Sequence, residues 1–148
     1  MYAKIFSYVM EIKRDLYLNK LIMSMHNGMI KIVTGIRRCG KSYLLFNLFS
    51  DYLKSQGVDE GHIIKVDLED RRNKKLRNPD ALLEYIDAHI TKEGMHYVML
   101  DEVQWVEEFE DVLNSYLKIP NVDVYVTGSN SKFLSSDVIT EFRGRGDE

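Results

Sequence analysis

Two patterns of hydrophobic positions alternate along the chain. Continuous apolar runs rich in β-branched residues, bounded by glycine or polar residues, predict buried strands at 29–34, 62–68, 97–100 and 122–126. Apolar residues at helical spacing, with charged residues between them, predict helices at 11–25, 42–54, 80–90 and 109–117. Strands that alternate with helices require right-handed crossovers, and therefore a parallel sheet with helices on both faces. The expected fold class is three-layer α/β.

Polar loops follow each of the four predicted strands. They come after Thr34, Leu68, Leu100 and Val126. Because the carboxyl ends of parallel strands lie at one edge of the sheet, these loops should meet there, and ligands bind at such an edge. We expect the functional site at this edge.

The first of these loops carries a phosphate-binding motif. GIRRCGKS fits the pattern G-x-x-x-x-G-K-[ST] and lies between a predicted strand and a predicted helix. In such a loop the backbone N–H groups surround phosphate, the lysine reaches the β- and γ-phosphates, and the hydroxyl ligates magnesium. We predict that Ser42 binds Mg²⁺ and that ATP is contacted by Gly35, Ile36, Arg37, Arg38, Cys39, Gly40, Lys41, Ser42 and Tyr43.

Three residues inside this loop have more than one interpretation. Arg37 and Arg38 could contact phosphate, a neighbouring subunit or only solvent. Cys39 could be a redox-sensitive thiol, but a small residue filling a permissive position explains it more simply.

Two acidic residues end the strand at 97–100. Asp101 can hold magnesium from the side opposite Ser42, and Glu102 can polarise the water that attacks the γ-phosphate. Two solvated acids would be the simpler interpretation if the phosphate loop were absent. The next strand ends in the polar residues of TGSN, which suit orientation of that water or sensing of the γ-phosphate through Asn130 or Ser129, although an ordinary turn would look the same.

Composition narrows the class of protein. The 148 residues are 45% hydrophobic and 29% charged, as in one ordinary globular domain. The net charge of −3 gives no global argument for binding nucleic acid or an anionic membrane. One cysteine cannot form an internal disulfide, the four histidines have no metal-ligand spacing, and no apolar run reaches the ~18 residues that span a bilayer. We expect a cytoplasmic protein with no membrane partner.

One segment concentrates positive charge. A nucleic acid or an acidic protein partner could bind to Arg71, Arg72, Lys74, Lys75 and Arg77. A solvated loop beside Glu69 and Asp70 is the simpler interpretation, because no aromatic stacking platform accompanies the segment in the sequence. Trp105 could anchor its loop against the following helix or take part in a subunit contact.

The three motifs GIRRCGKS, LDEVQ and TGSNS, in this order, resemble a family of AAA-like predicted ATPases of archaea and bacteria. The resemblance runs from about Asp15 to Arg145 and implies a P-loop NTPase core of the additional-strand, catalytic-glutamate type. It assigns Lys41 and Ser42 to phosphate and magnesium, Asp101 to magnesium and Glu102 to water. It further assigns Asn130 to the first sensor and Arg145 to an arginine finger, a role for which Arg143 competes, and so implies a homo-oligomer.

Such proteins continue into a fifth strand, a helical lid and commonly a nuclease-like C-terminal domain, whereas this chain stops at Glu148. We therefore expect residues 1–148 to be the N-terminal ATPase core of a longer protein, without the fifth strand and the lid. The edge of the strand at 29–34 would then be exposed.

The expected function is ATP binding and magnesium-dependent hydrolysis, coupled to a partner or to a C-terminal domain. A nucleotide-responsive binding or defence scaffold with slow turnover is the alternative. A kinase would need an acceptor pocket and a lid, and a GTPase would need a guanine-recognition motif that the sequence lacks.

Overall fold

A parallel sheet forms the centre of the domain. The computed structural model describes residues 14–34, 40–91, 93–129 and 139–141. Its five strands have the order β2-β3-β4-β1-β5, and all neighbours are parallel. Their bounds are Ile30–Thr34 for β1, Ile63–Asp67 for β2, His96–Asp101 for β3, Val122–Gly128 for β4 and Ile139–Glu141 for β5. The predicted parallel α/β fold is confirmed.

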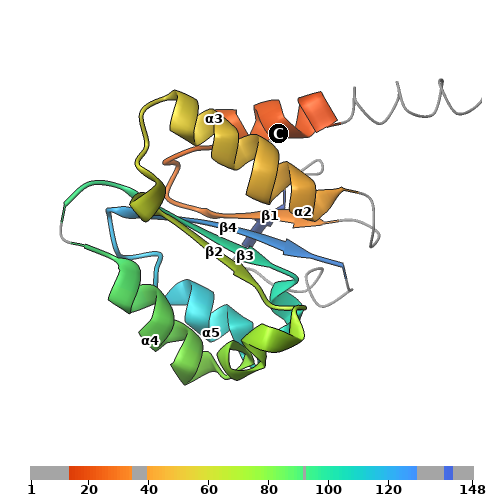
Figure 1. The fold of residues 1–148 in the computed structure, drawn as a ribbon, viewed down its shortest axis with the longest axis vertical. Coiled ribbons are helices and arrows are strands. Elements are labelled where there is room, and N and C mark those ends of the chain that lie inside the picture. The colour runs from red at the N-terminus through yellow and green to blue at the C-terminus, as the bar shows by residue number, and fades with distance from the viewer. Residues whose placement is uncertain (1–13, 35–39, 92, 130–138, 142–148) are drawn as a thin grey trace, which may run out of the picture.

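Helices cover both faces of the sheet (Figure 1). One face carries the helix at 14–23 and a second, continuous helix made of α2 (Lys41–Tyr43), the π-helical η1 (Leu44–Phe49) and α3 (Ser50–Ser55). The other face carries α4 (Pro79–His89) and α5 (Phe109–Asn114). The predicted helices are therefore present, with ends that shift by up to three residues.

Two hydrophobic clusters fill the spaces between the layers. Leu45, Phe49 and Leu53 pack with Tyr125 beneath the first pair of helices. The second cluster fills the space beneath α4 and α5 and includes Leu82, Ile86, Val98, Leu113 and Val126. Because helices bury both faces of the strands, the strands are continuously apolar rather than alternating.

Short 3₁₀ segments connect several elements: η2 (Glu60–His62), η3 (Arg71–Arg77) and η4 (Val103–Trp105). The start of α4 follows from local chemistry, since Asn78 Oδ1 accepts the Ala81 N–H at 3.0 Å and Pro79 occupies the first turn. Within the described residues, no helix is long and apolar enough to cross a membrane.

The expected absence of a fifth strand is wrong. β5 pairs with β1 in register, with Ile30 opposite Ile139 and Ile32 opposite Glu141. β1 therefore lies between β4 and β5, and its edge is not exposed as the sequence suggested. A three-residue strand has too few positions to show either apolar alternation or a continuous apolar run, which is why the pattern did not reveal it. The absence of a lid stays a prediction.

Candidate nucleotide and magnesium site

Four predicted functional residues meet at the carboxyl edge of the sheet. Lys41 begins α2 just after β1, Asp101 ends β3 and Glu102 follows it, and β4 runs between β1 and β3. The residues are buried, at 5%, 4% and 5% exposure for Lys41, Asp101 and Glu102, while neighbouring Ser42 is open to solvent. The topology thus joins two motifs that lie 60 positions apart.

The two predicted magnesium ligands are in direct contact. Ser42 Oγ donates a hydrogen bond to Asp101 Oδ2 at 2.6 Å. Burial raises the pKa of Asp101, and the charges of Glu102 and Asp67 add to that effect, while hydrogen bonds from Ser42 and Thr127 oppose it. A hydroxyl and a carboxylate oxygen side by side are a donor set that suits Mg²⁺, and a cation here would favour the ionised carboxylate.

Thr127 joins the two carboxylate residues, a role that the sequence did not reveal. Its buried Oγ1 donates to Asp101 Oδ1 at 2.5 Å and accepts the backbone N–H of Glu102 at 2.8 Å. The Thr127 hydroxyl therefore helps to orient both the side chain of Asp101 and the backbone of Glu102. The TGSN motif contained the signal, but we assigned the sensing role to the residues beyond the strand end.

The Glu102 carboxylate is held by several groups. Its Oε1 accepts hydrogen bonds from Ser129 Oγ and Gln104 Nε2, both at 2.7 Å, and its Oε2 lies 3.7 Å from Lys41 Nζ. The backbone of Glu102 is left-handed, with φ of 55°, a conformation that is uncommon for a residue with a side chain. Ser129 was one of two proposed sensors, whereas Gln104 had no role assigned from the sequence.

The phosphate-loop lysine is also tied to β4. Lys41 Nζ donates to the carbonyl of Gly128 at 3.1 Å. Gly40 precedes it with φ of 91°, which explains the glycine at this turn into the helix. Tyr43 is 47% exposed, and its ring lies 5.2 Å from the guanidinium carbon of Arg14, so a contact of Tyr43 with nucleotide stays a prediction.

Several predicted site residues lie outside the described residues: Gly35, Ile36, Arg37, Arg38, Cys39, Asn130, Arg143 and Arg145. Their assignments stay predictions. In the part of the chain that the structure describes, no group of three His, Cys, Asp or Glu side chains could hold a metal.

The basic segment forms η3, between β2 and α4. Four of its cations are exposed: Arg71, Arg72, Lys74 and Lys75. Arg77 is half-buried and donates to the carbonyls of Leu68 and Glu69 at 2.9 and 3.1 Å.

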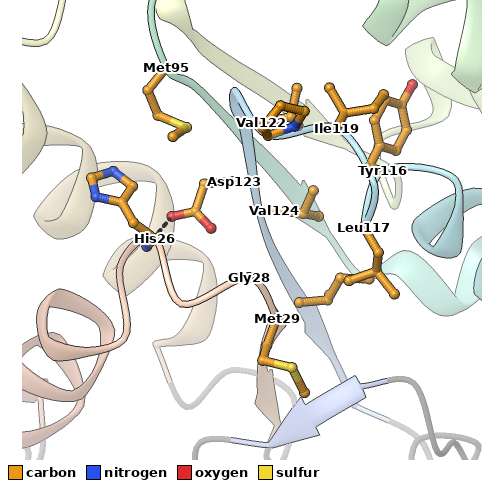
Figure 2. A pocket seen from close by; sticks show the side chains of 12 residues that line it. His26, Gly28, Met29, Met95, Tyr116, Leu117, Ile119, Val122, Asp123 and Val124 are labelled. Carbon is orange, nitrogen blue, oxygen red and sulfur yellow. Dashed lines mark hydrogen bonds between the residues drawn. The ribbon is translucent and has the colours of Figure 1, made fainter.

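A second polar cluster lies at the opposite end of β1 and β4, away from the phosphate loop. The Lys31 ammonium is fully buried and pairs with Asp123, which also accepts the Tyr125 hydroxyl at 2.5 Å. The His26 N–H donates to the same carboxylate at 2.9 Å, at the rim of a pocket of about 120 Å³ that Met29 and Met95 help to line (Figure 2). Nothing in the sequence pattern indicated this cluster.

Known proteins are similar to this chain in sequence. The curated relatives include an uncharacterized protein of Haemophilus influenzae, 31% identical over 90% of this chain and 34% of its own length. The uncharacterized protein MJ1544 of Methanocaldococcus jannaschii is 30% identical over 78% of this chain and 24% of its own length. The chain thus spans about a third and a quarter of these relatives.

Solved structures share the fold at low identity. The structure of Drosophila ORC bound to AT-rich DNA and Cdc6 has a TM-score of 0.58 at 12% identity, covering 94% of this chain and 56% of that one. The structure of C. elegans PCH-2 has a TM-score of 0.51 at 16% identity, covering 97% of this chain and 42% of that one. Residues 27–148 match the AAA domain family, in agreement with the phosphate-loop lysine and paired carboxylates, and the chain therefore belongs to that family.

Proposed function

We propose that this domain binds ATP with Mg²⁺ and hydrolyses it. The observation that carries the proposal is the contact of Ser42 Oγ with Asp101 Oδ2 at 2.6 Å, beside the buried Lys41 and Glu102. Ser42 and Asp101 would hold magnesium, which neutralises phosphate charge when it is bound. Lys41 would exchange its contacts with Gly128 and Glu102 for the β- and γ-phosphates.

Glu102 is proposed as the group that accepts a proton from the attacking water. The hydrogen bonds from Ser129 and Gln104 fix the orientation of its carboxylate, as a positioned base requires. Ser129, and Asn130 next to it, would position the water at the γ-phosphate. Arg145, or Arg143, would supply positive charge to the transition state across a subunit boundary.

The test compares wild-type protein with two variants. Glu102→Gln should keep ATP affinity in calorimetry and lower turnover about a hundredfold or more, because a positioned general base contributes that much. Lys41→Ala should instead weaken ATP binding about ten- to a hundredfold, through loss of a charged hydrogen bond. If binding and turnover fell together in Glu102→Gln, the residue would hold metal or structure instead.

A slow-turnover scaffold is the second candidate. It is favoured by the hydrogen bonds of Glu102. Two donors already bind its Oε1, so this oxygen is less available to a water molecule. In that case bound ATP should persist unhydrolysed for many minutes and should stabilise an assembly. Quench and chromatography of the bound nucleotide, next to sedimentation with and without ATP, separates the two functions.

The proposal also includes a longer full-length protein and an assembly of several subunits. We propose that residues 1–148 are the ATPase core of a longer protein, coupled to a partner or to a further domain. This proposal is supported by the lengths of the curated relatives, of which the chain spans about a third or less. An arginine finger in trans predicts complementation, so that Arg145→Ala mixed with Lys41→Ala restores part of the activity that each lacks. Without complementation, the finger acts within one subunit or is Arg143.

A further inference from the structure

The basic segment gains an aromatic neighbour in the folded chain. The guanidinium carbon of Arg77 lies 4.1 Å from the centroid of the Trp105 ring, although 28 positions separate the two residues. Arg77 cannot swing freely, because it also donates to the carbonyls of Leu68 and Glu69. Trp105 remains 44% exposed beside this anchored cation. The sequence offered no stacking platform next to the basic segment, and the tertiary structure provides one.

Few ion pairs neutralise the positive charge of the segment 71–77. Arg71, Arg72, Lys74 and Lys75 are all exposed, in a chain whose net charge is −3. Among the described residues, the ion pairs of these four are limited to Arg72 with Asp70, at 3.3 Å, and the Arg72 side chain is 91% exposed. The remaining cations are therefore available to an anionic partner.

We propose that Trp105 and the segment 71–77 form a binding surface for a single-stranded nucleic acid. An exposed indole stacks on bases of any sequence, and a guanidinium held against the ring adds a cation-π contribution. The exposed lysines and arginines of the segment 71–77 would contact the phosphates. An acidic peptide could form ion pairs with the cations, but its carboxylates would not stack on the indole. The exposed ring therefore favours a nucleic acid.

Two acidic residues next to Trp105 restrict the path that a nucleic-acid strand can take. Glu107 and Glu108 are exposed just after Trp105, on the side of α5. They would repel phosphate, so a strand should run along η3 rather than across the start of α5. The Trp105 N–H donates to the Glu102 carbonyl at 3.2 Å, so the surface adjoins the proposed site, but none of the proposed magnesium ligands contributes a side chain to it. Its binding does not require hydrolysis: Lys41→Ala should retain nucleic-acid binding even if the proposed ATPase activity proves wrong.

The chain offers a direct optical test, because Trp105 is its one tryptophan. Indole fluorescence and the anisotropy of a labelled oligothymidylate of about 20 nucleotides, longer than typical site sizes, are followed in the same titration. We expect saturable quenching of the indole. The logarithm of the association constant should fall with log salt at a slope of about −0.7 for each phosphate contacted.

Variants separate stacking from charge. Trp105→Ala should weaken binding about fivefold to a hundredfold, and Trp105→Phe, which keeps an aromatic face, should recover part of it. Lys74→Ser with Lys75→Ser should make the salt slope shallower by about 1.4. Lys118→Ser, an exposed cation beyond α5, is the matched control and should change neither quantity.

Three results would overturn the proposal. One is the absence of saturable binding at low salt. Another is unchanged oligonucleotide affinity in a folded Trp105→Ala protein, or equal losses of affinity in folded Trp105→Ala and Trp105→Phe proteins, with folding checked by circular dichroism. The third is polyglutamate binding as tightly as the oligonucleotide, which would assign the surface to an acidic protein partner.

Discussion

At the scale of single residues, the proposed nucleotide site depends on a hydroxyl that we do not expect to contact the nucleotide or the magnesium ion. Thr127 donates to the side chain of Asp101 and accepts from the backbone of Glu102. The left-handed backbone of Glu102 costs on the order of 1 kcal/mol or more, and this hydrogen bond helps to hold it. Loss of the hydroxyl should therefore disturb both proposed functions, magnesium binding and water activation.

The matched pair Thr127→Val and Thr127→Ser tests this role. Valine has nearly the same shape but leaves a buried carboxylate oxygen and a buried N–H without a partner, at about 1 to 3 kcal/mol each. We expect Thr127→Val to lower the free energy of unfolding by that order and to weaken magnesium-dependent ATP binding. Thr127→Ser keeps the hydroxyl and should behave almost as wild type. Equal urea midpoints and equal magnesium titrations for all three proteins would contradict the assignment.

At the scale of elements, β5 protects the edge of β1. Three residues pair with Ile30, Lys31 and Ile32, and so occupy backbone groups that would otherwise recruit another strand. The one charge on β1, Lys31, is fully buried by its pairing with Asp123, and it therefore cannot discourage association at that edge. Protection of the β1 edge from pairing with another chain therefore depends on β5 itself.

Two truncations measure that protection. A chain that ends after Val138 lacks β5, whereas a chain that ends after Glu141 keeps it, and both lack the residues beyond. We expect the shorter chain to self-associate in sedimentation velocity at concentrations where the longer one does not. Identical sedimentation of the two would show that the β1 edge needs no partner.

The alternation of apolar runs and helical spacing in the sequence was enough to place four of the five strands. Each of them has at least five residues, most of them apolar, as in IKIVT or HYVML. β5 and the short helices η3 and η4 lack such a run or period. Pairing with β1 identifies β5, whereas local hydrogen bonds in the folded chain identify η3 and η4. At the site, Lys41, Ser42, Asp101 and Glu102 followed from motifs, whereas Gln104 and Thr127 required the folded geometry.

At the scale of the whole molecule, stability depends on polar groups buried at the end of the sheet away from the nucleotide site. Lys31 pairs with Asp123 and donates further to Asn27 Oδ1 and to the Met29 carbonyl, at 3.2 and 2.9 Å. Burial lowers the pKa of Lys31, while the charge and hydrogen bond of Asp123 oppose that effect. The attraction between Lys31 and Asp123 therefore offsets the free-energy cost of removing both charges from water. Neither residue could offset its own cost without the other.

Breaking this pair from one side should be expensive. Lys31→Met leaves Asp123 as an uncompensated buried charge, and we expect a loss of about 3 to 5 kcal/mol in the free energy of unfolding. The double variant Lys31→Met with Asp123→Leu removes both charges and should recover part of that loss; the rest remains because the Tyr125 hydroxyl and the His26 N–H lose their acceptor. Chemical denaturation of the wild type, both single variants and the double variant completes the cycle. Additive losses would show that the two groups are not coupled.

His96 should make stability depend on pH. Its ring is buried at the start of β3, accepts the Thr91 N–H at 3.1 Å, and lies 4.3 Å from the ring of His62. Burial, and then the charge of His62, lower the pKa of His96. The unfolded chain therefore binds a proton at a higher pH than the folded chain does. Stability is retained above about pH 6.5 and is lost as the pH falls further.

A substitution that cannot titrate isolates this effect. His96→Gln keeps an acceptor for the Thr91 N–H, and its free energy of unfolding should fall less steeply between pH 7 and pH 5. A single titrating group can contribute at most about 1.4 kcal/mol per pH unit to the slope of the free energy of unfolding against pH. Urea denaturation at each pH gives both profiles. Parallel profiles would assign the acid sensitivity to other groups.

The sequence alone determined the parallel α/β fold and indicated the AAA-type nucleotide-binding module. Both rest on local patterns, because a phosphate loop needs its glycines and lysine at fixed spacing and a buried strand needs a continuous apolar run. Only the tertiary structure decided which distant side chains become partners: Thr127 with Asp101, Lys31 with Asp123, and Arg77 with Trp105. Such partners lie on different elements, 26 to 92 positions apart, and their contact depends on strand order and register, which no local pattern in the chain records.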